Sequence, residues 1–372
     1  DVYKPISNLT FRYGARYDRS IFRNDVGDAI IDVGVIQPRV SIIWDPWADA
    51  KTKLVANYGR FSNPGRIGLA SALSKSGLGQ KLFLGEFFSE FTNTAGNDYY
   101  YFPAEDFNTM HDTMTAPRGD EFSVGAERAL IDDLAAKLYF TGKFTRNIYA
   151  FDETNLLWDE DGYNIIGAGN GSFVTHYRYR TPDIAQRNYI RTDLGFNKVW
   201  SNRWEAQVNY SYTLSRGTTQ NSPTAFLSVP QQTEYFVGSY LATDIRHDIT
   251  AGFAWELPND PWTTRLGSTL FMESGYPLSR TYSNGNYGDY GRGYIYKDTV
   301  GSYARSKTWY ELNILIQQAI PVRKGKLWGV CQLDNITNSR TGWGAYVSGD
   351  NRWIISARQN PIRVTLGGRY EF

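Results

Sequence analysis

The last residues of the chain alternate between apolar and polar side chains with the period of two that marks a β-strand. One face would carry the apolar residues and a glycine: Ile362, Val364, Leu366, Gly368, Tyr370 and Phe372. The other face would carry Arg363, Thr365, Gly367, Arg369 and Glu371. In a soluble sheet such a terminal strand would expose an apolar edge, which natural proteins avoid. In an outer-membrane barrel the apolar face meets lipid and the edge is paired, so the pattern predicts a transmembrane β-barrel.

The same alternation divides the rest of the chain into about a dozen antiparallel strands. The clearest runs from Trp204 to Ser215, and the first begins at Leu9. Short turns, such as Asp132-Asp133 and Ser201-Asn202, alternate with long connections, as in a barrel with periplasmic turns and extracellular loops. We expect one all-β domain over residues 1–372, with long extracellular loops near 19–37, 62–119, 152–187, 217–243, 280–306 and 338–360.

Composition agrees with a barrel and excludes some other classes. Aromatic residues make up 16% of the chain, which suits a barrel with two aromatic girdles. The mean hydropathy is −0.46, and no apolar run approaches the roughly 18 residues of a membrane helix. A net charge of +1 gives no basis for nucleic-acid binding. The polar strand faces mix both charge signs, which favours a lumen that holds protein over a pore tuned to one ion sign.

Several short stretches resemble the C-terminal half of TonB-dependent outer-membrane receptors, particularly the Oar-like branch. They include Leu9-Thr10-Phe11-Arg12-Tyr13-Gly14-Ala15-Arg16-Tyr17-Asp18 and the hairpin of Pro38-Arg39-Val40-Ser41-Ile42-Ile43-Trp44-Asp45-Pro46 with Tyr58-Gly59-Arg60-Phe61. Later landmarks are Asp244-Ile245-Arg246-His247-Asp248, Ser274-Gly275-Tyr276-Pro277, Asp334-Asn335-Ile336-Thr337-Asn338 and the closing Arg369-Tyr370-Glu371-Phe372.

The resemblance implies a barrel of about 22 strands in the cell outer membrane of a Gram-negative bacterium, crossing it many times. It also implies an N-terminal plug and a TonB box, neither of which lies in this sequence. On this interpretation the partners are outer-membrane lipid, the missing plug and barrel half, and TonB. The rival is a self-contained barrel of about 12 strands, such as a pore, an outer-membrane enzyme or an autotransporter translocator. Pairing between the strands around Phe11 and Leu366 would favour that closed barrel.

Catalytic and metal-binding patterns are weak, so we expect no enzyme activity, no cofactor and no metal site. The three histidines are scattered: His247 has lipid-facing parity, and His111 and His176 fall in long loops. Cys331 is interpreted as a small apolar strand residue. The stretch Asp159-Glu160-Asp161-Gly162-Tyr163-Asn164 resembles a calcium loop only in part, and a solvated loop tip is the preferred interpretation.

Two loops combine tyrosine with glycine or other aromatics, which suits contact with a sugar or a peptide. The candidate ligand-binding residues are Tyr99, Tyr100, Tyr101, Tyr287, Tyr290, Tyr294 and Tyr296. The alternative is that these loops pack on each other over the barrel mouth. The predicted function is TonB-dependent uptake of an extracellular substrate, and an oligosaccharide or peptide is favoured over a ferric chelate. The alternative is a binding or assembly barrel that docks a surface protein through loops 62–119 and 280–306 without transport.

The last strand also predicts a barrel-assembly signal formed by Leu366, Tyr370 and Phe372. The strand must be recognised and paired before the barrel closes, and an aromatic residue anchors it at the membrane interface. The alternative is that Phe372 is one more residue of the aromatic girdle.

Overall fold

A single antiparallel sheet of 13 strands organises the protein. The computed structural model describes residues 1–23, 27, 29–63, 81–82, 100–101, 108–110, 114–160, 165–169, 177–218, 224–226, 236–283, 294–296, 298–348 and 352–372. In this part of the chain the regular secondary structure is all β. No helix there is long and apolar enough to cross a membrane.

The strands of the main sheet follow one another in sequence order. They are β1 (Val2–Ile6), β2 (Leu9–Arg23), β3 (Ala29–Trp44), β4 (Thr52–Phe61), β8 (Arg118–Ile131), β9 (Leu134–Arg146), β14 (Arg187–Ser201), β15 (Trp204–Gly217), β17 (His247–Leu257), β18 (Thr263–Glu273), β23 (Trp309–Val322), β24 (Gly325–Asp334) and β27 (Arg363–Glu371). Each pairs with its neighbours in the list, so the topology is a simple meander.

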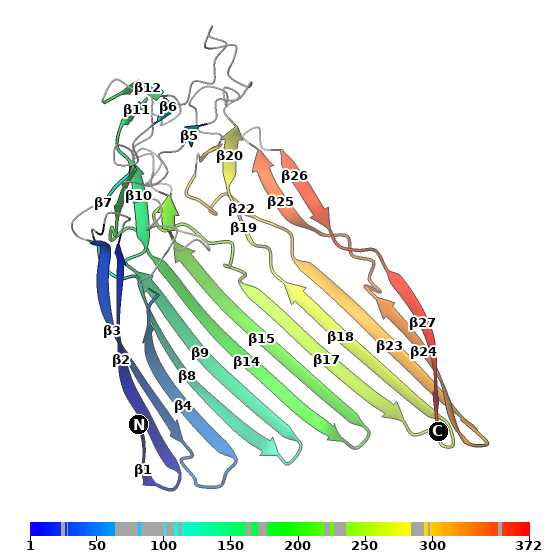
Figure 1. Ribbon diagram of the computed structural model, residues 1–372. Coiled ribbons are helices and arrows are strands. Elements are labelled where there is room, and N and C mark those ends of the chain that lie inside the picture. The colour runs from blue at the N-terminus through cyan, green and yellow to red at the C-terminus, as the bar shows by residue number, and fades with distance from the viewer. Residues whose placement is uncertain are drawn as a thin grey trace.

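The sheet is a curved wall with short turns at one end and all the long connections at the other (Figure 1). The β14–β15 turn illustrates how the sequence sets the short end. Asn202 and Arg203 both have positive φ, at 50° and 69°, as a two-residue type I′ hairpin requires. The short turns after β3, β8, β14, β17 and β23 lie where the alternation predicted them.

Two elements differ from the sequence prediction. β1 precedes the expected first strand, so the sheet has 13 strands instead of about 12. The predicted loop near 19–37 is mostly strand, because β2 and β3 continue as a long hairpin through this region. Ile31 and Val33, which are buried, pack with Tyr149 above the main sheet and give the hairpin its own small core.

Short strands form five further small sheets among the long connections. A four-stranded sheet has the order β16 (Thr224–Phe226), β10 (Tyr149–Glu153), β13 (Tyr177–Arg180), β7 (Asn108–Met110). A second has the order β21 (Tyr294–Tyr296), β20 (Arg280–Ser283), β25 (Gly342–Ser348), β26 (Trp353–Arg358). Three pairs are β11 (Leu156–Trp158) with β12 (Ile165–Ala168), β19 (Pro277–Leu278) with β22 (Ala304–Arg305), and β5 (Lys81–Leu82) with β6 (Tyr100–Tyr101).

The two faces of the main sheet differ sharply in chemistry. One face carries apolar side chains that are left exposed, such as Leu138, Val208 and Leu366. The other carries the polar residues of each strand. β27 pairs with β24 and β1 pairs with β2, and no pairing in the described chain joins β27 to β1 or β2. The described sheet is therefore open, and the pairing that would mark a closed barrel of this size is not found.

Candidate functional site

Side-chain hydrogen bonds, both between neighbouring strands and within a strand, connect the polar residues of this face. Ser41 donates to Asn57 Oδ1 over 2.6 Å, and Asn57 Nδ2 donates to Ser123 over 3.0 Å, so one row links β3, β4 and β8. In β14, Arg191 donates to Asp193 over 2.7 Å. These bonds satisfy polar groups along the wall and hold their side chains in fixed positions.

Glycines let the longer side chains lie flat against this face. A Cβ on Gly125 would come within 2.3 Å of the Tyr139 ring, so the ring occupies space that only glycine leaves. From there the Tyr139 hydroxyl donates to Glu127. In the same way, a Cβ on Gly195 would lie 2.3 Å from Lys137 Cε. Tyr139 and Lys137 therefore lie along the wall over neighbouring glycines.

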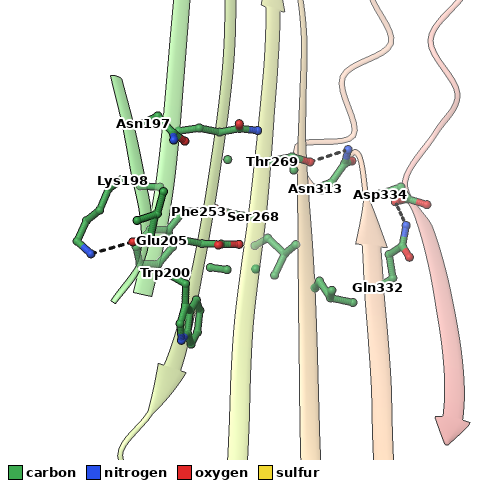
Figure 2. A pocket seen from close by; sticks show the side chains of 18 residues that line it. Asn197, Lys198, Trp200, Glu205, Phe253, Ser268, Thr269, Asn313, Gln332 and Asp334 are labelled. Carbon is green, nitrogen blue, oxygen red and sulfur yellow. Dashed lines mark hydrogen bonds between the residues drawn. The ribbon is translucent and has the colours of Figure 1, made fainter. Parts of the chain in front are cut away.

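A hollow of about 550 Å³ lies on the wall between β14 and β24 (Figure 2). Its polar lining is mainly amide, hydroxyl and carboxylate: Asn197, Glu205, Gln207, Thr269, Asn313, Gln332 and Asp334. Gln332 donates to Asp334 over 2.7 Å, and Asn313 donates to Thr269 over 3.4 Å. Figure 2 shows these side chains coming from successive strands across the hollow. The lining also includes apolar side chains such as Phe253, Ile314 and Leu315, so the hollow is about half polar and half apolar. Such a mixed surface is suited to contact with a protein segment or a ligand.

Charge is unevenly distributed over the polar face. From β2 to β14 the basic residues outnumber the acidic ones; they are Arg12, Arg16, Arg39, Lys53, Lys137, Lys143, Arg187 and Arg191, against Asp18, Glu121, Glu127 and Asp193. From β15 to β23 acidic residues outnumber basic ones on the polar face of these strands. The acidic residues are Glu205, Asp248, Glu256, Glu273 and Glu311, and the basic residue is Arg265. Asp248 and Glu273 even lie directly opposite each other. The wall thus has a basic part and an acidic part.

Trp328 joins the last strand to this face, and sequence reasoning missed it. Its side chain is 3% exposed, and its indole N–H donates to Glu371 Oε2 over 2.8 Å. The guanidinium groups of Arg265 and Arg369 each lie 5.2 Å from the Trp328 ring. A signal was present, because Trp328 has the polar parity in β24, where a tryptophan is out of place.

The predicted tyrosine sites fall in different places. Tyr100 and Tyr101 form β6, whereas Tyr294 and Tyr296 lie in β21, which pairs with β20. The structure puts the two groups in separate small sheets. Tyr99, Tyr287 and Tyr290 lie outside the described residues, as does most of the partial calcium loop at 159–164 and of the apolar stretch at 65–90. Their role as ligand contacts stays a prediction.

The three residues of the predicted assembly signal share the apolar face of β27 and its end. Leu366 is 76% exposed and Phe372 is 99% exposed. Tyr370 contacts Phe372 edge to face, with ring centroids 4.8 Å apart. Their placement on one exposed apolar face agrees with the alternation, and their role in assembly stays a prediction.

His247 lies on the apolar face, as its parity predicted, and Cys331 lies on the same face. His247 lies opposite Tyr212, and its Nδ1 is 2.9 Å from the Tyr210 hydroxyl. Cys331 is half-buried between Ile316 and Leu366. In the described part of the chain no group of three or more His, Cys, Asp and Glu residues is arranged to hold a metal ion.

Solved outer-membrane transporters share this fold. The FrpB iron transporter from Neisseria meningitidis (F5-1 variant) aligns with 100% of this chain and 44% of its own, at 14% identity and a TM-score of 0.56. The ferric preacinetobactin receptor BauA from Acinetobacter baumannii aligns with 98% of this chain and 40% of its own, at 11% identity and a TM-score of 0.55. The outer membrane transporter YddB from Escherichia coli aligns with 99% of this chain and 52% of its own, at 10% identity and a TM-score of 0.54.

The chain has the fold of an outer-membrane transporter barrel. It spans about half or less of the length of the transporters it matches. Sequence identities of 10–14% show the fold and no more. The names of these proteins describe transporters and receptors. No protein-family profile matches the sequence, and no curated protein matches it.

Proposed function

We propose that this chain is the C-terminal part of the barrel of a TonB-dependent outer-membrane receptor that takes up an extracellular substrate. One observation carries the proposal: the whole sheet superposes on FrpB, an iron transporter, while covering 44% of that protein. The sequence landmarks of the Oar-like branch run in the family's order along the same strands and support the assignment.

The open edges of the sheet support a larger barrel. All five residues of β1 and all nine of β27 are exposed, and in the described part of the chain each strand has one side without a partner, on which a further strand would pair. Strands supplied by the rest of the protein, to a total of about 22, would close the wall, and a plug would fill the lumen. The polar face, with its flat side chains and mixed charges, is the surface that such a plug would contact.

The substrate is proposed from chemistry alone. The tyrosines of loops 62–119 and 280–306 suit an oligosaccharide or a peptide, because aromatic rings stack on sugars and grip extended chains. FrpB and BauA are named for iron and for a ferric siderophore, so a ferric chelate is the competing class. Uptake measured with each of the three substrate classes decides between them.

Energy coupling tests the transport function itself. The full-length protein, expressed from its complete gene, is compared in cells with and without TonB, and with and without a proton gradient. Transport predicts that substrate accumulation collapses in both deficient conditions while binding at the cell surface persists. Accumulation that does not depend on TonB would contradict the proposal.

The tyrosine sites are tested in the same cells. Replacing Tyr287 and Tyr290 with alanine, or Tyr99, Tyr100 and Tyr101 together, should lower surface binding of the correct substrate at least fivefold. Tyr17→Ala is the matched control, since Tyr17 is 63% exposed but lies on the apolar face of β2. Equal binding by all these variants would remove the loop tyrosines from the site.

A docking role without transport is the second candidate. The β11–β12 hairpin exposes two apolar side chains, Leu157 at 53% and Ile166 at 68%, among the long connections. Such side chains favour contact with another protein. This role predicts a stable surface partner that co-purifies equally from cells with and without TonB.

A further inference from the structure

The apolar face of the sheet ends at a definite row on the long-loop side. Across β4, β8, β9, β14 and β15, the register places the following outward-facing residues in one line: Arg60, Asp120, Phe144, Asn188 and Arg216. The outward row just below it is Tyr58, Phe122, Gly142, Ile190 and Leu214. In β15 every outward residue from Trp204 to Leu214 is apolar or aromatic, so Arg216 is the first charged residue on that face. This row marks the boundary of the lipid-facing band.

Three arginines converge on one tyrosine at this boundary. An isolated bridge joins Tyr240 to Arg216, whose guanidinium donates to the Tyr240 hydroxyl over 2.5 Å. The guanidinium carbons of Arg216, Arg246 and Arg305 lie 4.4, 5.2 and 5.8 Å from the centre of the Tyr240 ring. The ring holds the three cations together, although like charges at this spacing repel each other.

A buried carboxylate, that of Asp244, holds two of the three arginine side chains in place. Asp244 is fully buried and accepts from Arg246 at 3.1 Å and from Arg305 at 2.5 Å. Arg305 also donates to the carbonyl oxygens of Asp244 and Gly275, at 2.7 and 3.0 Å. Within the described chain Asp244 is the one carboxylate that pairs with this group, so the cluster of Arg216, Arg246, Arg305 and Asp244 keeps an excess of positive charge.

Another arginine of the same row, Arg60, is neutralised by a carboxylate and serves as a comparison. On β4, Arg60 forms a two-point ion pair with Asp120, at 2.7 and 3.3 Å. Among the described residues Arg216 has no such carboxylate partner, and its side chain is exposed at the edge of the apolar band. Arg246 and Arg305 keep 24% and 32% of their side chains accessible, so the cluster is preorganised and open to an incoming anion.

We propose that the cluster of Arg216, Arg246 and Arg305 binds the phosphate of a lipid headgroup. Guanidinium groups match phosphate oxygens with paired hydrogen bonds, and arginine is the residue favoured for such contacts. The position of the cluster along the strands fits a lipid headgroup, because the cluster begins where the apolar band of the sheet ends. Two rows below Arg216, the rings of Tyr212 and His247 lie 5.4 Å apart on the same face, as in an interfacial aromatic girdle beside lipid chains.

This inference rests on the proposed membrane location and is independent of transport and of TonB. The test uses the full-length protein, extracted from its membrane in mild detergent and examined for bound lipid by native mass spectrometry. Arg216→Gln is the informative variant, because the Arg216 side chain is exposed and forms no ion pair with a residue that the structure describes. Arg203→Gln is the matched control, an exposed arginine in a turn at the opposite end of the sheet.

We expect wild type and Arg203→Gln to retain a phosphate-bearing lipid, and Arg216→Gln to lose at least fivefold of it at an unchanged thermal unfolding midpoint. Equal retention by Arg216→Gln overturns the proposal. A second measurement adds millimolar inorganic phosphate or a dephosphorylated form of the same lipid. Retention that resists free phosphate and fails for the dephosphorylated lipid supports the lipid source, and displacement by free phosphate overturns it. If the protein does not fractionate with membranes, the membrane location fails instead, which is a separate result.

Discussion

Trp328 and Glu371 are joined by a hydrogen bond of 2.8 Å on the polar face, from the indole N–H to a carboxylate oxygen. The backbone pairing of β24 with β27 is therefore reinforced by a side chain close to the end of the last strand. Trp328→Phe should keep most of the ring contacts with Arg265 and Arg369 but lose the donor. We expect a loss of about 1 kcal/mol in the free energy of unfolding.

The measurement for Trp328→Phe is the thermal unfolding midpoint of the purified protein in detergent. Trp262→Phe is the control, because Trp262 lies in the β17–β18 turn and is 49% exposed. A midpoint for Trp328→Phe that equals that of the control would show that the bond to Glu371 contributes nothing measurable.

Phe372→Ala should lower the amount of protein assembled in the outer membrane severalfold while leaving substrate binding per assembled molecule unchanged. Phe372 is 99% exposed and its ring contact is with Tyr370, so its removal takes little packing from the folded sheet. An effect on level would thus arise during assembly. Phe196→Ala is the control, an aromatic residue on the apolar face that is 43% exposed. Equal levels for the two variants would make Phe372 an ordinary girdle residue.

Asn335→Asp should destabilise the connection between β24 and β27 by about 2–3 kcal/mol. Asn335 is buried, and its Nδ2 donates to the carbonyl oxygens of Ser339 and Asn360, at 2.8 and 2.7 Å. An aspartate has the same shape and tolerates the positive φ of 49°. However, it places a carboxylate oxygen, which cannot donate, opposite the two carbonyl oxygens of Ser339 and Asn360. Urea unfolding or limited proteolysis of the 338–360 segment measures the loss.

Asn338→Asp is the matched control for Asn335→Asp. Asn338 has the same φ of 49°, and its Oδ1 accepts from Ile362 N over 3.2 Å, a bond that aspartate preserves. If both variants were equally destabilised, the cause would be charge or backbone conformation and not the lost donors.

A pH-dependent contribution is expected at the short-turn end. A hydrogen bond from the Ser201 hydroxyl and then the Lys198 ammonium lower the pKa of Asp133, which lies in the turn between β8 and β9. A carboxyl group whose pKa is lower in the folded state stabilises the fold above its unfolded pKa of about 3.9, and this stabilisation is lost as the pH falls through the folded value. Asp133→Asn should lower the thermal midpoint at pH 7 and match wild type near pH 2.

Asp132→Asn is the control for the pH series, because Asp132 lies in the same turn and is exposed. The ammonium of Lys198 lies 2.9 Å from Asp133, and the lysine side chain is only 8% exposed. A difference between Asp133→Asn and wild type that stays constant from pH 7 to pH 2 would rule out ionisation of Asp133 as its source.

The main sheet could be predicted from the sequence because its order is local. Each strand pairs with the next along the chain, and alternation assigns every residue to a face. The pattern Trp204 to Ser215 is β15, and its partner across the turn is β14, as predicted. β1 was missed, since Val2–Ile6 contains a lysine and a proline and does not alternate.

The long-loop end could not be predicted, because its contacts join segments far apart in sequence. Tyr149 pairs in parallel with Thr224, and Arg280 pairs in parallel with Val347. Alternation within one segment says nothing about such partners. Of the arginines around Tyr240, Arg216 lies at the end of β15, Arg246 directly precedes β17 and Arg305 lies in β22, so their meeting is visible only in the fold.

The division of the polar face into a basic part and an acidic part gives the wall a preferred orientation for any charged body that lies against it. Arg12, Arg39 and Lys143 belong to one arc of the wall, and Asp248, Glu273 and Glu311 belong to another. A body with its own separated charges, placed against such a wall, is favoured in the orientation that brings opposite charges together and meets like charges in the reversed orientation. The side chains of the wall thus specify orientation without any single contact that fixes it.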